Sequence, residues 1–150
     1  MKIRKAKFQD VKIYWSWFND TEVKKNSFHY KRVSYKEHCE WFDKKINDKN
    51  NYLYIALIKN VPCSQIRIEL KENQYILSYS VDKAFRMKGL GKKTLLLVLK
   101  RLSNLKNFKK LPIIAKVKKQ NIPSIKVFEF LNFQKKIYKD YLIFQKKLNY

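Results

Sequence analysis

Apolar residues recur along this chain with two spacings, every second residue in some segments and every third or fourth residue in others. The alternating spacing predicts strands, and the helical spacing predicts helices. The alternating segments predict seven strands, over residues 2–8, 51–58, 63–70, 74–82, 111–117, 133–139 and 141–148. The helical segments predict four helices, over residues 11–18, 92–105 and 124–131 and over a segment that opens at Ser34. This mixed order is typical neither of a doubly wound fold nor of an all-β barrel.

Short polar signals mark where several of these elements begin. Asp10 precedes the first predicted helix as a candidate N-cap, and Ser34 followed by Glu37 forms a capping box before the second. Residues 59–62 predict a turn between two strands. The chain contains no repeat, no low-complexity tract and no Gly/Ser-rich linker, so we expect one domain over residues 1–150.

Composition supports a folded core and limits the class of protein. The chain has 150 residues, of which 45% are hydrophobic and 15% aromatic. No apolar run approaches the roughly 20 residues that cross a bilayer, and the charged N-terminus has no secretory pattern, so we expect no membrane partner. Two cysteines without a CxxC spacing and two histidines predict no disulfide framework and no metal site, and they favour a reducing, cytoplasmic location.

The formal net charge is +23, from 35 Lys and Arg residues against 12 Asp and Glu residues. Such a charge invites a nucleic-acid partner, bound in a salt-dependent way. However, 30 of the cations are lysines scattered along the chain, which favours a biased composition over selected phosphate contacts. We therefore do not expect nucleic acid as the partner. Residues 76–150 hold 19 cations and 3 acids, so an anion is expected to bind in the second half.

Both glycines of the chain lie in one segment, Arg86 to Gly91, between a predicted strand and a predicted helix. Glycines at the start of a helix let a ligand approach free backbone N–H groups, where the helix dipole favours an anion. Lys88, Lys92 and Lys93 add positive charge there. The segment predicts a pyrophosphate cradle, with a tight strand-to-helix turn as the alternative. Its spacing fits neither a Walker A loop nor a dinucleotide fingerprint.

The pattern Arg86-x-x-Gly89-x-Gly91 after a strand resembles the acetyl-CoA loop of the Gcn5-related N-acetyltransferase (GNAT) superfamily. Residues 121–133 resemble its second signature, N-x-x-[AS]-x-x-[FLV]-[YF]-E-x-x-G-F, although Asn132 replaces the usual glycine. The resemblance covers nearly the whole chain. It implies an α+β, three-layer GNAT fold with four helices and a central, mostly antiparallel sheet of about seven strands. The sheet would splay open between strands 4 and 5, where acetyl-CoA would lie.

The resemblance also implies which residues bind acetyl-CoA, as a co-substrate and without a metal. Backbone groups of the strand before the glycine loop would bind the pantetheine amides, and the loop would hold the pyrophosphate. The second signature would meet the pantetheine and the far end of the cofactor. The implied positions are Ser80, Val81, Arg86, Met87, Lys88, Gly89, Leu90, Gly91, Lys92, Asn121, Ser124 and Lys126.

Acetyl transfer to an amine needs a neutral amine, a polarised carbonyl and a protonated or stabilised thiolate. Many superfamily members use a Tyr as general acid at the position that Phe128 occupies here. Tyr138 and Tyr141 are the alternative hydroxyls, unless the thiolate leaves unaided. Glu69 and His38 are the candidate bases, and for each of them a structural role is the alternative.

The first half narrows the resemblance. Residues 17–20, 38–42 and 64–67 resemble the W-x-N-D, H-x-x-W-F and G-Q-I-R elements of nucleotide-amino-sugar N-acetyltransferases of pseudaminic acid biosynthesis, although a serine replaces the glycine. That family acetylates UDP-4-amino-4,6-dideoxy-N-acetyl-β-L-altrosamine. The resemblance implies direct attack by the sugar amine in a ternary complex, with Asn19 and Arg67 binding the substrate.

Two other functions stay open at this point. One is a protein N-terminal acetyltransferase of the ribosomal-protein type, and the other is a basic nucleic-acid-binding module without enzymatic activity. Turnover on amino-sugar nucleotides but not on peptides would separate the amino-sugar acetyltransferase from the protein acetyltransferase. The apolar residues Tyr141, Ile143 and Phe144 of the last strand, if exposed, could extend the sheet into a homodimer.

Overall fold

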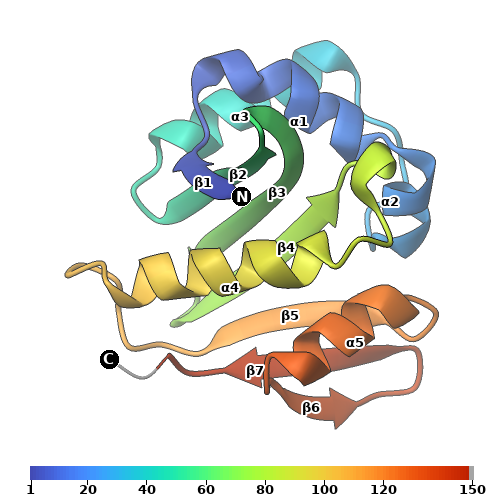
Figure 1. The fold of residues 1–150 in the computed structure, drawn as a ribbon, viewed down its shortest axis with the longest axis vertical. Coiled ribbons are helices and arrows are strands. Elements are labelled where there is room, and N and C mark those ends of the chain that lie inside the picture. Colours follow the sequence, from blue (N-terminus) through green and yellow to red (C-terminus); the bar gives the residue numbers. More distant parts are fainter. Residues whose placement is uncertain (149–150) are drawn as a thin grey trace.

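The computed structural model describes residues 1–148, which form a seven-stranded sheet with helices on both faces (Figure 1). The strands lie in the order β1-β2-β3-β4-β5-β7-β6. Their bounds are β1 Lys2–Lys5, β2 Asn51–Ile58, β3 Val61–Lys71, β4 Gln74–Val81, β5 Ile113–Lys118, β6 Gln134–Ile137 and β7 Tyr141–Lys146. The α+β fold that the sequence predicts is confirmed.

The sheet opens between β4 and β5, as predicted. Every other neighbouring pair of strands is antiparallel, whereas β4 and β5 are parallel and pair only at Tyr75–Ile113 and Ile76–Ile114. Beyond these two pairs the strands diverge, so the rest of β4 has a sheet partner on its β3 side alone. Figure 1 shows this gap widening toward the carboxyl end of β4.

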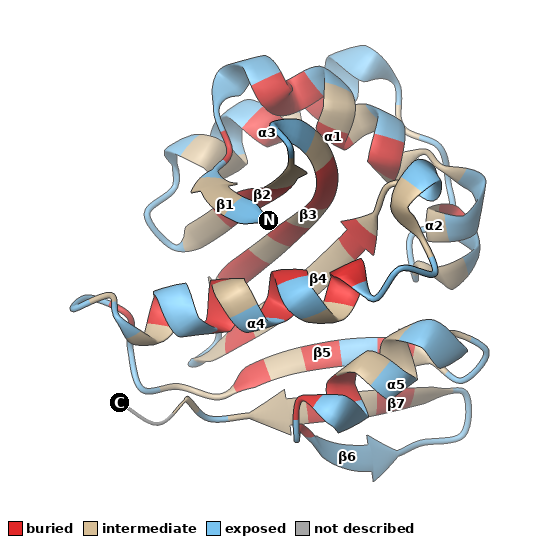
Figure 2. Ribbon diagram, viewed as in Figure 1, coloured by how far each residue is buried: buried red, intermediate tan, exposed pale blue. Residues whose placement is uncertain are grey.

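Five α-helices cover the two faces of the sheet. Their bounds are α1 Val11–Phe18, α2 Thr21–Asn26, α3 Tyr35–Asn47, α4 Leu90–Ser103 and α5 Ile122–Phe130. Apolar residues of α1 and α3 pack with Leu53 and Ile55 of β2 on one face. Alternate residues of the strands, such as Ile66 and Ile68 of β3, pack with α4 and α5 on the other face. Figure 2 shows this burial along β3 and on one side of α4.

Local sequence signals explain how some helices begin. At α3 the predicted capping box is confirmed: Ser34 Oγ accepts from the Glu37 N–H (3.2 Å), and the Ser34 N–H donates to Glu37 Oε2 (3.0 Å). The expected cap of α1 is wrong, because the Asp10 side chain makes no bond to that helix. Its carboxylate instead accepts from the Lys7 N–H (2.7 Å) and from the Arg4 guanidinium (2.7 Å).

Other differences from the prediction are local. Helix α2 was not predicted, because its sequence TEVKKN has no apolar period, and its start depends on Asp20, whose Oδ1 accepts from the Val23 N–H (3.1 Å). The β2–β3 turn is shorter than expected, with positive φ at Lys59 and Asn60 only and strand resuming at residue 61. Phe144 lies in the core rather than on the surface, which corrects the basis given for a homodimer.

None of the helices in residues 1–148 is long and apolar enough to cross a membrane. Within the same described range, no cluster of three or more His, Cys, Asp or Glu side chains is arranged to hold a metal ion.

Candidate functional site

A cavity of about 770 Å³ occupies the gap in the sheet. Residues 76–81 of β4 form one wall and residues 115–117 of β5 form the other. The loop from Arg86 into α4 and the first turn of α5 close one end, and side chains from α1, α2, α3 and β3 line the other. The cavity therefore has one end at a helix N-terminus and a second end lined by aromatic side chains together with Arg67 and Glu22.

The helix end of the cavity is built around Gly89, which is the N-cap of α4 and has a φ of +68°. The first intrahelical bond of α4 joins the Lys93 N–H to the Gly89 carbonyl (3.3 Å), so the N–H groups of Leu90, Gly91 and Lys92 have no acceptor in the helix. No side chain among residues 1–148 caps this helix start. A Cβ on Gly89 would meet no atom within 4 Å, which leaves open space beside the loop. The donor set and this space fit a pyrophosphate.

Gly91 faces a different environment, the side chain of Tyr79 on β4. A Cβ on Gly91 would lie 3.0 Å from Tyr79 Cε2. The Tyr79 hydroxyl lies 3.0 Å from Ser124 Oγ on α5, and the Tyr79 ring packs edge-on against Phe128 (5.9 Å between centroids). Tyr79 thus joins the glycine loop to α5 across the cavity. Tyr79 was not among the residues predicted from the sequence, because its partners Gly91 and Ser124 are distant along the chain.

Ten of the twelve predicted cofactor positions line this cavity. They are Ser80, Val81, Arg86, Met87, Gly89, Leu90, Gly91, Lys92, Asn121 and Ser124. The other two, Lys88 and Lys126, do not line it, and the Lys88 ammonium donates to the Ala84 carbonyl (3.0 Å). Asn121 has a structural duty as well, because its Oδ1 accepts from the Ser124 N–H (3.3 Å) at the start of α5.

His38 lies at the other end of the cavity and is 2% exposed. Its ring packs against Trp41 (5.3 Å between centroids) and Phe42 (6.0 Å). Burial lowers the pKa of His38 to about 4, a hydrogen bond with the Val11 backbone opposes this shift, and the Lys24 charge adds to it. His38 is therefore neutral at pH 7, and its Nε2 has no hydrogen-bond partner among the described residues.

Arg67 of β3 lines the cavity beside this histidine. Its guanidinium carbon lies 5.1 Å from the ring centroid of Trp41. Burial lowers the pKa of Arg67, and the charges of Glu69 and Tyr14 oppose this. Five ion pairs occur in residues 1–148, and none of them includes Arg67. A half-buried cation facing a cavity without a carboxylate partner is suited to binding an anion from solution.

The remaining predicted site residues lie outside the cavity lining. Glu69 forms ion pairs with Lys45 and Lys71. Burial raises the pKa of Glu69, but the hydrogen bond from Lys45 and the charges of Lys45, Lys71 and Arg67 together outweigh burial, so the pKa is lowered. Tyr138 stacks on Tyr141 at the surface, with ring centroids 4.9 Å apart.

Asn19, predicted to bind substrate, does not line the cavity. Its side chain is hydrogen-bonded to the backbone before α3. Its Nδ2 donates to the Val33 carbonyl (3.0 Å) and its Oδ1 accepts from the Val33 N–H (3.0 Å). Of the predicted catalytic and substrate residues, the structure therefore brings only His38 and Arg67 together in the cavity.

Comparison with known proteins gives the same fold throughout. YncA from Salmonella typhimurium, whose structure contains its cofactor acetyl-CoA, has a TM-score of 0.82 at 18% identity, over 100% of this chain and 95% of that one. An N-acetyltransferase from Staphylococcus aureus Mu50 has a TM-score of 0.81 at 19% identity, over 99% and 98%. Ribosomal-protein-alanine N-acetyltransferase from Brucella melitensis has a TM-score of 0.81 at 17% identity, over 99% and 100%.

At these low identities, the similarity shows the fold alone. No curated protein matches the chain. The sequence profile of the acetyltransferase (GNAT) family, however, matches residues 11–133. That range includes the glycine loop, both walls of the gap and α5. The chain therefore belongs to the acetyltransferase (GNAT) family, whose enzymes use acetyl-CoA.

Proposed function

We propose that this enzyme transfers the acetyl group of acetyl-CoA to the amine of a nucleotide-linked amino sugar, by direct attack in a ternary complex. The observation that carries the choice of acceptor is Arg67, a half-buried guanidinium that faces the cavity without an ion-pair partner among the described residues. The diphosphate of a nucleotide sugar would supply the missing negative charge.

Acetyl-CoA would bind along the gap in the sheet. The N–H groups of Leu90, Gly91 and Lys92 would hold its pyrophosphate, with the helix dipole favouring the negative charge. Beyond Ile76, the β4 edge that faces β5 has no strand partner within residues 1–148. Apart from the Val81 carbonyl, which accepts from Arg86, its backbone N–H and C=O groups would therefore be available to the pantetheine amides. When bound, acetyl-CoA supplies an activated carbonyl.

The acceptor would bind at the end of the cavity that His38, Trp41 and Arg67 line, called the acceptor end below. This end favours a neutral amine. Arg67 and the buried Lys24 bring two positive charges to this end against the one carboxylate of Glu22, and a net positive field disfavours an ammonium ion. Neutral His38 has a free Nε2 that would accept a hydrogen bond from the amine and hold its lone pair toward the gap. His38 is therefore our choice among the candidate bases, because it alone of them lines the cavity.

The departing thiolate has no hydroxyl at Phe128, which is buried and packed between Tyr79 and Phe133. Positive charge is one means of stabilising it, beside the hydroxyls of Tyr79 and Ser124 that also line the cavity. Lys116 of β5 lines the cavity and would contribute.

A protein N-terminus is the second candidate acceptor, favoured by the fold similarity to ribosomal-protein-alanine N-acetyltransferase. An acceptor panel with acetyl-CoA separates the two. UDP-linked 4-amino sugars and short peptides with free N-termini are supplied in turn, and acetylated products are detected by mass spectrometry. The proposal expects product from the sugars and none from the peptides; product from the peptides alone would replace it with the second candidate.

A further inference from the structure

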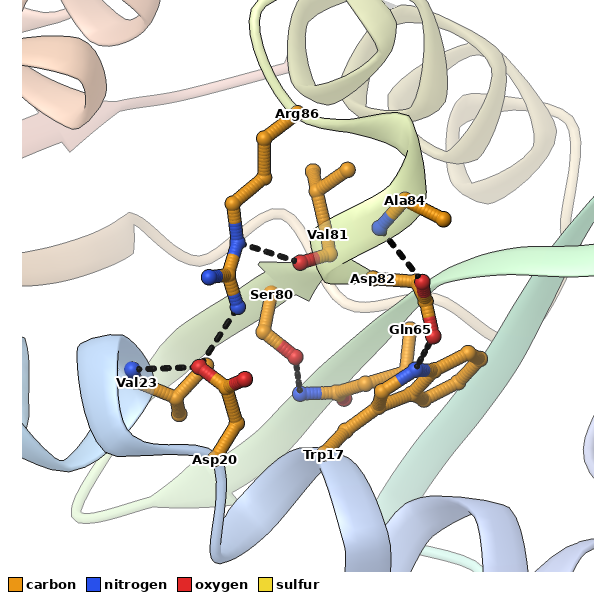
Figure 3. A network of polar contacts seen from close by, with 9 residues as sticks. All are labelled: Trp17, Asp20, Val23, Gln65, Ser80, Val81, Asp82, Ala84 and Arg86. Atoms are coloured by element: carbon orange, nitrogen blue, oxygen red, sulfur yellow. Dashed lines mark hydrogen bonds and ion pairs between the residues drawn. The ribbon is translucent and has the colours of Figure 1, made fainter.

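A network of polar contacts joins the corner between α1 and α2 to the glycine loop (Figure 3). Its centre is Asp20, whose Oδ1 accepts from the Val23 N–H (3.1 Å) and also from Arg86 Nη2 (2.6 Å). The side chains of Asp20 and Arg86 are 18% and 29% exposed. One carboxylate oxygen therefore both starts helix α2 and anchors the first residue of the loop motif.

Arg86 is occupied on a second side as well. Its Nε donates to the Val81 carbonyl (3.1 Å), at the end of β4. Figure 3 shows the guanidinium between Val81 and Asp20. Two of its nitrogens thus serve acceptors within the protein. The guanidinium of Arg86 is engaged with the structure around the loop, whereas the N–H groups that fit a pyrophosphate belong to Leu90, Gly91 and Lys92.

A second contact joins the corner between α1 and α2 to the turn before the glycine loop. Trp17 Nε1 of α1 donates to Asp82 Oδ2 (2.7 Å), and Asp82 Oδ1 accepts from the Ala84 N–H (2.9 Å) at the turn that leads into the loop. The loop is therefore tied to α1 and α2 at two points. These ties span 65 and 66 residues of sequence.

The segment that contains α2, residues 20–28, also contacts the other half of the sheet. The Lys118 ammonium of β5 donates to the Lys25 carbonyl of α2 (3.1 Å), and the Lys116 ammonium lies 4.3 Å from the ring centroid of Phe28. Between its two anchors, α2 presents Val23 and Asn26 to the cavity. The segment thus bridges the opening of the gap and forms part of the acceptor end.

We propose that Asp20 and Arg86 are positioning residues that hold the coenzyme loop and α2 in one arrangement, so that coenzyme binding orders the acceptor end of the cavity. The proposal rests on the proposed function only in that CoA occupies the loop from Gly89 to Lys92. It assigns Arg86 to the support of that loop and leaves the phosphates to the backbone N–H groups.

The test is a double-mutant cycle on CoA affinity, measured by titration calorimetry. Asp20→Ser keeps an oxygen that can cap α2 but removes the carboxylate, and Arg86→Gln removes the charge of its partner. We expect each variant to weaken CoA binding roughly tenfold, and the double variant to bind no more weakly than either single one. Unchanged or tighter binding in Asp20→Ser with weaker binding in Arg86→Gln would overturn the proposal, as would additive losses.

Hydrogen exchange provides a second readout. CoA should slow exchange of the α2 amides in the wild-type enzyme and leave them unaffected in Asp20→Ser; equal slowing in both would contradict the coupling. The matched control is Asp10→Ser, which breaks the Arg4–Asp10 ion pair outside the cavity. It should lower thermal stability without changing CoA affinity. Absence of CoA binding by the wild type would instead contradict the proposed function itself.

Discussion

Gly91 and Tyr79 are in such close contact that a single added methyl group on Gly91 would lie 3.0 Å from the tyrosine ring. Tyr79 cannot easily withdraw, because its hydroxyl is bonded to Ser124 and its ring packs against Phe128. Gly91 is therefore required for close packing of α4 on β4, and the position of the loop N–H groups depends on that packing.

Gly91→Ala should destabilise the protein by about 1–3 kcal/mol through overpacking, and it should weaken CoA binding. Urea unfolding measures the first effect and calorimetry the second. Tyr79→Leu removes the ring edge, so adding Gly91→Ala to Tyr79→Leu should no longer lower stability below that of Tyr79→Leu alone. If Gly91→Ala proves as stable as the wild type, the close contact has no energetic weight.

Gly89 has the opposite requirement, a left-handed backbone with free space beside it. Gly89→Val should cost about 1–2 kcal/mol of stability while the chain still folds, and it should abolish CoA binding. Gly89→Asn, which tolerates the left-handed region, should keep most of the stability and still lose affinity because its side chain fills the same space. Normal CoA affinity in both variants would contradict the placement of the pyrophosphate.

Arg67→Met should raise KM for a nucleotide-linked amino sugar by roughly 10- to 100-fold, because a charge-assisted contact is lost, and leave CoA affinity unchanged. Arg101→Met is a suitable control, since Arg101 also lies over an aromatic ring (5.8 Å from the Tyr54 centroid) but outside the cavity. Steady-state kinetics on both variants measures the difference. An unchanged KM in Arg67→Met would remove the basis for an anionic acceptor.

His38 should make stability depend on pH. Its pKa falls from 6.5 in the unfolded chain to about 4 in the folded one, so the unfolded state binds more protons between these values. Its contribution is fully present above pH 6.5 and is lost as the pH falls toward 4, by up to about 3 kcal/mol. Urea unfolding of the wild type and of His38→Phe at pH 7.5 and 4.5 measures this. If the free energies of unfolding of the two proteins change in parallel with pH, His38 is not buried in its neutral form.

Much of the fold was predictable because its signals are local. The Ser34–Glu37 capping box and the glycine loop are each readable within a few residues. The order of elements excluded a doubly wound fold and an all-β barrel, and the resemblance to the GNAT superfamily implied the α+β fold with its open sheet. Helix α2 was not predictable in this way. Its six residues have no apolar period, and the helix depends on the Asp20 cap and on contacts with distant segments.

The candidate site shows the same division. Most cofactor positions are consecutive in sequence and were identified together. Catalytic candidates depend instead on which strand face and which helix side meet in space. Glu69 is in the same strand as Arg67 and on the same face, yet it does not line the cavity, and its carboxylate pairs with Lys45 of α3. Tyr79 was missed because its role requires Gly91 and Ser124, 12 and 45 residues away.

The most direct test is the specificity of acetyl transfer by the wild-type enzyme. kcat/KM with acetyl-CoA is measured for a UDP-linked 4-amino sugar and for a peptide with a free N-terminus, in the same buffer and with acetylated product quantified by mass spectrometry. We predict a kcat/KM for the sugar nucleotide at least roughly 100-fold above that for the peptide, as expected when the half-buried cation of Arg67 requires an anionic partner. Equal or greater turnover on the peptide would contradict the account.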